Sequence, residues 1–343
     1  MNVEQYVREM PKVELHLHLE GSIRPEVLLE LAHKNDVTLP YDTVDGIRRW
    51  YQFRDFDHFI EIYLVICSTL QSPEDFSQIT YDLGKTLAAQ NCRYTEITWT
   101  PGAHAKTYED YLCLFDGIID GQRRAEEEFD IVMGWVPDVA RQLPSEHGEM
   151  IAQWISTPES QKRGVVAFGI GGPEVGHPPE KFEWAAALAA DNGLPCNPHA
   201  GETVGPQSIW NAILVLNARR IKHGIRAIED AELVDYLAEH NILIEVCPTS
   251  NLCLGVYSEY DAYPLKVFAE KGVPFTISSD DPPMFNTTLT DEYLHVVQDC
   301  GLSLEQLEQS VLDGLRHSYL PDARKKELIS EFTAEFQYLR TTS

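Results

Sequence analysis

The stretch VELHLHLEGS, residues 13–22, places His16 and His18 one residue apart in an otherwise apolar run. Strand side chains alternate between two faces with a period of two, so a β-strand here puts both imidazoles on one face. Buried imidazole nitrogens need partners. The stretch therefore fits either two hydrogen-bonded core histidines or two ligands of a metal ion, and the remainder of the chain has to decide between these alternatives.

Short runs of β character alternate with longer amphipathic segments along the chain, which indicates an α/β protein. Eight such runs predict a (β/α)₈ TIM barrel, with a doubly wound open sheet as the alternative. A barrel brings all C-terminal strand ends to one mouth, whereas an open sheet leaves its first and last strands apart. The predicted strands are residues 13–19, 93–100, 130–138, 164–172, 195–201, 220–225, 242–250 and 274–282.

We expect residues 1–343 to form a single barrel domain, with a long helical insertion over residues 20–92, after the first strand. Extra helices from about residue 291 to residue 343 are expected to close it. The insertion contains FDHFIEIYLVICSTL, which has an apolar stripe at positions i, i+3, i+4 and i+7. This stripe indicates either a helix packed on the core or a lid over the barrel mouth. Its residues are Phe56, Phe59, Ile60 and Tyr63.

Charge and composition narrow the class of partner. The net charge is −27, from 54 acidic and 27 basic residues, and such a field repels nucleic-acid backbones. No run approaches the roughly 18 consecutive apolar residues that cross a membrane, and the N-terminus lacks a signal-peptide apolar region. We therefore expect a cytoplasmic protein that acts on a small molecule. The seven cysteines include no CxxC pair, which favours free thiols over a disulfide framework or a thiolate zinc site.

Metal-binding residue types gather at the predicted C-terminal strand ends. His199 and Glu202 end the fifth strand, and His223 ends the sixth. Asp280 and Asp281 lie at the end of the eighth. One histidine at a strand end is commonly structural, but four histidines and two adjacent aspartates at one barrel mouth favour a metal site. A catalytic zinc ion takes about three protein ligands and keeps one position open for water.

These motifs follow one another in a specific order: PKVELHLHLEGS, GIGGPE, NPHAGE, RIKHG, CPTSN and SSDDPP. In this order, and along nearly the whole chain, the sequence resembles the adenosine deaminase family of the amidohydrolase superfamily. The resemblance implies a zinc-containing (β/α)₈ barrel that hydrolytically deaminates a 6-aminopurine. Other amidohydrolases hold two metals through a lysine on the fourth strand. GVVAFGIGG has no lysine, so we expect one Zn²⁺ per chain.

The resemblance also implies a role for each matching residue. A zinc-bound hydroxide attacks C6 of the purine, His223 orients the water and takes up its proton, and Glu202 donates a proton to N1. Asp280 is both a ligand and a catalytic residue. Neutral imidazoles and one carboxylate suit zinc. The implied ligands are His16, His18, His199 and Asp280.

The resemblance further implies that Asp281 meets N7 of the base and that the backbone N–H of Gly172 meets N3. From the residues alone, Gly172 could equally be a turn residue, and Asp281 could instead orient a metal ligand. His18 and Glu20 are expected to bind substrate as well. The apolar stripe in residues 56–63 aligns with the family's lid helix over the ribose side.

Several positions depart from the pattern of adenosine-specific members, which carry HLDG where this chain has HLEG. Relatives acting on adenine or on 6-aminodeoxyfutalosine can carry glutamate at the position of Glu20. GIGGPE has Gly169 and Pro173 where acidic residues are usual, and SDDPPMFNTT lacks the SDDPAYFGG-like segment of adenine-specific members. We expect conversion of adenosine to inosine and ammonia, with 6-aminodeoxyfutalosine as the second candidate substrate and adenine as the third. Another metal-dependent hydrolase, such as an amidase, or a non-catalytic binding barrel remains an alternative.

Overall fold

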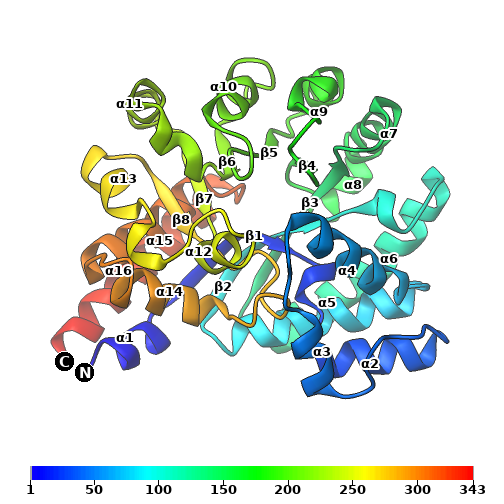
Figure 1. Cartoon of the computed structure of the whole chain (residues 1–343). Helices are drawn as coiled ribbons and strands as arrows, with labels where there is room; N and C mark the ends of the chain where they lie inside the picture. Colours follow the sequence, from blue (N-terminus) through cyan, green and yellow to red (C-terminus); the bar gives the residue numbers. More distant parts are fainter. Residues whose placement is uncertain (1, 343) are drawn as a thin grey trace.

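The computed structural model describes residues 2–342 and contains eight parallel strands in the order β1 to β8. Every neighbouring pair from β1·β2 to β7·β8 is parallel, as a barrel of βα units requires. The strands lie at the centre, and helices surround them (Figure 1). The predicted (β/α)₈ barrel is thereby confirmed. The strands are β1 (Lys12–His18), β2 (Cys92–Trp99), β3 (Val132–Ala140), β4 (Phe168–Gly171), β5 (Cys196–Ala200), β6 (Arg220–His223), β7 (Leu243–Val246) and β8 (Phe275–Ile277).

The barrel closes through the segment that follows β8. The Asp280 N–H donates to the carbonyl oxygen of His16 at 3.1 Å, and the His18 N–H donates to the carbonyl oxygen of Asp280 at 3.0 Å. Asp280 has a φ of 64°, in the left-handed region, so regular strand geometry cannot continue through it. The predicted strand over residues 274–282 was therefore too long. The prediction over residues 242–250 was too long for another reason, because Pro248 opens helix α12 (Pro248–Cys253).

The insertion between β1 and β2 is helical, as predicted. It contains α2 (Pro25–Lys34), α3 (Val44–Trp50), α4 (Phe56–Ser68) and α5 (Pro73–Ala88), after a 3₁₀ turn at Glu20–Ser22. Helix α4 begins at Asp55, whose carboxylate accepts a hydrogen bond from the His58 N–H at 2.8 Å. The predicted apolar stripe lies on this helix.

The remaining helices follow the later strands. They are α6 (Tyr108–Glu128), α7 (Ser145–Ile155), α8 (Pro158–Lys162), α9 (Glu183–Asp191), α10 (Pro206–Leu214), α11 (Ala231–Glu239) and α13 (Leu265–Lys271). Short 3₁₀ turns lie at Pro101–Ala103, Pro179–Phe182, Ile225–Glu229 and Tyr260–Ala262. None of the helices within residues 2–342 is long and apolar enough to cross a membrane.

The C-terminal helices are α14 (Leu289–Gln298), α15 (Leu304–His317) and α16 (Asp322–Thr341). They pack beside an N-terminal helix, α1 (Val3–Glu9), that the sequence analysis did not predict. Glu308 of α15 joins the two ends of the chain, because it accepts hydrogen bonds from Tyr6 of α1 and Arg340 of α16. The termini accordingly lie side by side (Figure 1).

The barrel interior contains a fully buried layer of charged side chains. Arg220 lies 2.7 Å from the Glu96 carboxylate and 2.6 Å from the Glu245 carboxylate. Lys222, on the same strand, donates to the hydroxyl of Thr98. Buried charges are tolerated only when they are paired and hydrogen-bonded, so this layer depends on the correct register of β2, β6 and β7.

Candidate active site

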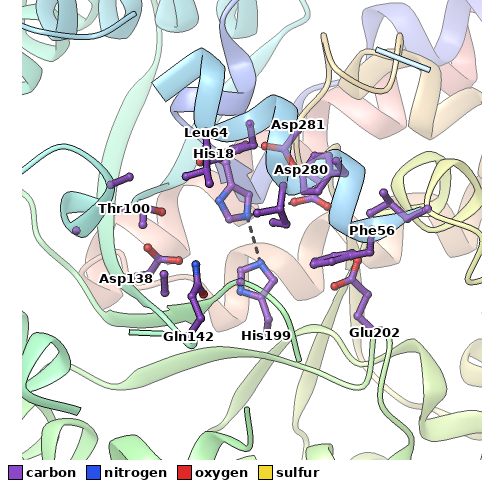
Figure 2. Close-up of a pocket in the computed structure, with 18 of the residues that line it drawn as sticks. His18, Phe56, Leu64, Thr100, Asp138, Gln142, His199, Glu202, Asp280 and Asp281 are labelled. Atoms are coloured by element: carbon purple, nitrogen blue, oxygen red, sulfur yellow. Dashed lines mark hydrogen bonds and ion pairs between the residues drawn. The ribbon is translucent and has the colours of Figure 1, made fainter. Parts of the chain in front are cut away.

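Three imidazole nitrogens and one carboxylate oxygen converge at the barrel mouth. The Nε2 atom of His199 lies 3.1 Å from Nε2 of His16 and 3.2 Å from Nε2 of His18. The Oδ1 atom of Asp280 lies 3.3 Å from the same two atoms of His16 and His18. His18, His199 and Asp280 point toward one another (Figure 2). The four predicted ligands thus meet at one point, although they come from β1, β5 and the segment after β8.

The hydrogen bonds of these imidazoles define their tautomers. The Nδ1 atom of His199 lies 2.8 Å from the carbonyl oxygen of Ile170, and Nδ1 of His16 lies 3.3 Å from that of Glu245. A carbonyl oxygen only accepts hydrogen bonds, so each Nδ1 carries the hydrogen and each Nε2 carries a lone pair. Two lone pairs 3.1 Å apart repel each other unless a cation lies between them.

The spacing of the four atoms fits zinc. Tetrahedral zinc with bonds of about 2.0–2.1 Å holds its ligand atoms about 3.3–3.4 Å apart. The observed separations are 3.1–3.3 Å. His223 also lies near this cluster, but its Nε2 is 3.9 Å from Asp280 Oδ2. His16, His199 and Asp280 also group with His223, with their ligand atoms within 4.8 Å of one another. His18 is the better fourth ligand, because its Nε2 lies 3.2 Å from His199 and 3.3 Å from Asp280.

The surroundings favour the protonation states that metal ligands need. Burial lowers the pKa of His16 to about 4 and lowers the pKa of His199 well below its usual value, so both rings are neutral. Burial alone would raise the pKa of Asp280, but His16 and His18 beside it hold this pKa well below its usual range. Neutral imidazoles and an ionised carboxylate are the forms that bind a divalent cation.

Glu202 and His223 lie side by side next to the cluster. Nε2 of His223 is 3.6 Å from the Glu202 carboxylate. Burial, together with the charges of Asp280 and Glu174, raises the pKa of Glu202 well above its usual value, which favours the protonated carboxyl. Burial lowers the pKa of His223 to about 4, which leaves its imidazole neutral. The amide nitrogen of Asn251 lies 3.3 Å from Nδ1 of His223, and the amide oxygen accepts from Tyr263, so the neutral ring carries its hydrogen on Nε2. The pair therefore presents a carboxyl group and a ring N–H beside the cluster.

The loop that carries Glu202 is held by one buried carboxylate, that of Glu174, in the GIGGPE segment. Oε1 accepts a hydrogen bond from the Gly201 N–H at 2.7 Å. Oε2 accepts from the N–H groups of Glu202 at 3.1 Å, Thr203 at 2.9 Å and Val204 at 2.9 Å. Hydrogen bonds to a charged acceptor are among the strongest in proteins. The sequence analysis missed this residue, because the segments that it joins meet only in the folded chain.

A cavity of about 360 Å³ opens beside the cluster. Most of the predicted site residues line it: His18, Phe56, Phe59, Ile60, Tyr63, Gly172, His199, Glu202, His223, Asp280 and Asp281. The apolar stripe of α4 thus forms one wall. Two glycines make room at this site. Gly172 has a φ of 83°, and a Cβ on Gly21 would lie 1.6 Å from the Asp281 carboxylate.

His16 and Glu20 are the predicted residues that do not line the cavity. His16 belongs to the cluster and is fully buried, whereas Glu20 lies behind the wall and is also fully buried. The Glu20 carboxylate accepts hydrogen bonds from the side chain of His104 at 2.9 Å, the N–H of Thr100 at 3.2 Å and the hydroxyl of Tyr63 at 3.2 Å. Burial opposes ionisation, but the bond from His104 lowers the pKa of Glu20 overall. Glu20 thus supports the wall residue Tyr63.

Three further polar residues line the cavity, and the sequence analysis did not select them: Thr100, Asp138 and Gln142. They lie together on one side of the site (Figure 2). Burial raises the pKa of Asp138 to about 6. Asp138 closes the third predicted strand, 130–138, so the strand-end criterion that selected His199 and Asp280 could have found it.

A (β/α)₈ barrel with three histidines, an aspartate and a buried glutamate at its mouth has the architecture of a hydrolase with a candidate metal site. Residues 11–335 match the family model described as adenosine deaminase. The chain belongs to the adenosine deaminase family, and the resemblance of its motifs is confirmed. It is an enzyme of the deaminase class.

Relatives within the family differ in the substrate that they are named for. The chain is 37% identical over 333 residues to an aminodeoxyfutalosine deaminase from Streptomyces coelicolor, covering 96% of this chain and 85% of the relative. It is 35% identical over 327 residues to an adenine deaminase from Cupriavidus taiwanensis, covering 95% and 92%. The solved structure of an adenine deaminase from Arthrobacter aurescens superposes with a TM-score of 0.89 at 29% identity, over 96% of this chain and 99% of the other.

We predict that Glu174→Gln loosens the loop over residues 201–204. The amide offers one acceptor oxygen where the carboxylate offers two, and its NH₂ group would face backbone N–H donors. Each charged hydrogen bond that is lost should shift the equilibrium between the ordered and the open loop about tenfold or more toward the open form. Hydrogen–deuterium exchange should show faster exchange of these amides. Glu180→Gln is the matched control, since Glu180 accepts from Asn211 outside the loop. Unchanged protection in Glu174→Gln would contradict the prediction.

Proposed function

We propose that this enzyme catalyses zinc-dependent hydrolytic deamination of a 6-aminopurine that carries a substituent on N9, with 6-aminodeoxyfutalosine as the foremost substrate. The proposal depends on one observation above all, the close approach of three imidazole nitrogens and a carboxylate oxygen beside the buried acid Glu202. The net reaction consumes water and replaces the 6-amino group with a 6-oxo group, which releases ammonia.

Four residues would hold a single zinc ion: His16, His18, His199 and Asp280. Three imidazoles and one carboxylate suit zinc among the common divalent metals. When bound, the ion lowers the pKa of a coordinated water from 15.7 to about 7, which makes a nucleophile available at neutral pH. Nδ1 of His16 and Nδ1 of His199 each bond to a backbone carbonyl oxygen, and this orients the Nε2 atom of each ring toward the proposed metal position. These hydrogen bonds support the assignment.

The proton transfers are proposed for two residues beside the cluster. His223 orients the attacking water through its Nε2, which faces Asp280 and Glu202, and stabilises the proton that the water loses. Glu202 donates its carboxyl proton to N1 of the ring, which offsets the charge that builds up as C6 becomes tetrahedral. The proton that the water loses then leaves with the amino group as ammonia, and the hydroxyl proton that remains on C6 returns to Glu202 as the 6-oxo group forms.

Base recognition is proposed for Asp281 and Gly172. Burial and the neighbouring charge of Asp280 raise the pKa of Asp281 well above its usual value, so its carboxyl can donate to N7. The backbone N–H of Gly172 would meet N3. An amidase acting on an acyclic amide has no use for acids aimed at ring nitrogens, so Glu202 and Asp281 together favour the deaminase over the amidase alternative.

The relatives bear on the N9 substituent. The sequence alone placed adenosine first, but the similar proteins are named for aminodeoxyfutalosine and adenine, and this supports the alternative substrates. A cavity of about 360 Å³ falls in the range of about 300–1,000 Å³ for pockets that enclose small-molecule ligands larger than a bare ring. The apolar residues of α4 extend its wall beyond the cluster. We therefore place 6-aminodeoxyfutalosine first, adenine second and adenosine third.

An ammonia-release screen tests the proposal directly. The zinc-loaded enzyme should be compared on 6-aminodeoxyfutalosine, adenosine, 2′-deoxyadenosine, adenine and N6-methyladenine by kcat/KM. We expect the largest value for 6-aminodeoxyfutalosine. Release of ammonia from none of these compounds would contradict deamination itself, whereas a different order among them would revise only the N9 substituent.

We predict that Asp280→Ala loses zinc. Removal of one of the four ligand atoms leaves three imidazoles and no compensating negative charge, so the purified variant should contain well below one zinc ion per chain. Metal content measured by mass spectrometry checks this. Asp281→Asn is the matched control, because its side chain is not one of the four, and it should retain zinc. Equal zinc in both variants would exclude Asp280 as a ligand.

We predict that Glu202→Gln retains zinc and substrate affinity but loses turnover. The amide cannot supply a proton to N1, and loss of a general acid lowers kcat by about 10²- to 10⁴-fold. Steady-state kinetics with the best substrate of the screen measures kcat and KM separately. Glu229→Gln, outside the cavity, should match the parent enzyme. Turnover of Glu202→Gln within threefold of the parent would refute the assigned role.

A further inference from the structure

The carboxylate of Asp138 faces the cavity without a full set of partners. Asp138 is 2% exposed, and its Oδ1 atom has no hydrogen-bond partner among residues 2–342. It lines the cavity with Thr100 and Gln142. These three residues lie on one side of the site, whereas Glu202 and Asp281 lie on the other (Figure 2). A buried acceptor left free beside a ligand cavity indicates a group that meets the ligand.

The neighbouring strand is shaped around this carboxylate. Asp138 pairs in register with Gly169 of β4. A Cβ on Gly169 would lie 2.6 Å from the Cβ of Asp138, and a Cβ on Gly171 would lie 2.4 Å from its Oδ2. Any larger residue at these two positions would displace Asp138. The glycines of GIGG therefore keep the carboxylate in its position at the cavity wall.

Asp138 could instead serve only as a counter-charge for the buried Lys222. The geometry favours a ligand role. The Lys222 amine donates to the hydroxyl of Thr98, and no ion pair within 4 Å joins it to Asp138 in the described part of the chain. A carboxylate placed for Lys222 would not leave Oδ1 unpartnered.

We propose that Asp138 determines substrate specificity by accepting hydrogen bonds from the vicinal hydroxyl groups of a sugar on N9. This inference rests on the proposed deamination and adds the substrate class, namely sugar-bearing purines as opposed to the free base. In the proposed pose, C6 lies at the metal cluster, N1 points toward Glu202 after β5, and N3 lies at Gly172 after β4. The ring edge thus runs from β5 to β4, and its N9 side faces β3, the next strand around the barrel. Asp138 lies near the end of that strand.

The chemistry of the cavity disfavours a phosphorylated sugar on N9. A carboxylate has two oxygens that can accept from the two donors of a vicinal diol. Lys and Arg are absent from the cavity lining among the described residues, and Asp138 would repel a phosphate. The site therefore fits a nucleoside-type substrate and disfavours a nucleotide.

The test compares substrates with and without the sugar hydroxyls. We expect Asp138→Asn to lower kcat/KM about 10- to 100-fold, mainly through KM, on adenosine or 6-aminodeoxyfutalosine, whichever the parent enzyme uses better. On adenine and on 2′,3′-dideoxyadenosine the same variant should stay within about twofold of the parent. The parent enzyme itself should prefer adenosine to its dideoxy form by a similar factor. Asp75→Asn is the matched control, a buried carboxylate that binds Lys34 away from the cavity.

Each outcome has one interpretation. An equal loss on adenine and on the sugar-bearing substrate would make Asp138 a structural counter-charge and overturn the inference. A parent enzyme that deaminates adenine alone, or that does not distinguish adenosine from its dideoxy form, would also overturn it and leave deamination intact. If Asp138→Asn does not fold, the comparison of adenosine with its dideoxy form on the parent enzyme still decides. Failure to deaminate any 6-aminopurine would instead remove the proposed function.

Discussion

The approach of two unprotonated imidazole nitrogens to 3.1 Å is the constraint on which the site depends. These nitrogens belong to His16 on β1 and His199 on β5, so their meeting requires a closed barrel. Closure is made by the backbone of Asp280, which bonds to His16 and His18 while its side chain faces the same two rings. The hydrogen bonds that close the sheet are thus the ones that assemble the cluster.

The cluster is also tied to the charged layer beneath it. The carbonyl oxygen of Glu245 accepts from Nδ1 of His16, and its carboxylate pairs with Arg220. A shift of one residue in the register of β7 would therefore break a buried ion pair and reverse the direction of Glu245 at once. Because Glu245 bonds to His16 and also pairs with Arg220, the barrel interior holds the His16 ring in position although its lone pair faces that of His199. The free energy that orients the ligands comes from the barrel interior.

Local rules predicted the barrel and the group of candidate residues at its mouth, and the resemblance then selected the four implied ligands from that group. Alternation with a period of two put His16 and His18 on one face, and the strand-end rule brought in His199 and Asp280. The role of Glu174 could not be derived in this way, and the strand-end rule, which also points to Asp138, does not show why the Asp138 carboxylate lacks a partner. The significance of Glu174 comes from four N–H groups of a loop about 30 residues later, and that of Asp138 comes from the absence of side chains on β4. Both depend on which segments become neighbours, and a residue pattern carries no information about that.

Glu20 and Asp138 together explain why the substrate could not be assigned from the HLEG motif. The resemblance implies that an aspartate at the position of Glu20 meets a ribose hydroxyl. The longer glutamate side chain accepts three hydrogen bonds, from His104, Thr100 and Tyr63, and lies behind the wall. A carboxylate with three internal donors has little capacity left for a ligand. Under the proposed role of Asp138, which has a free oxygen and a place in the cavity wall, the departure at Glu20 would change which carboxylate meets the sugar and would not by itself indicate a free base.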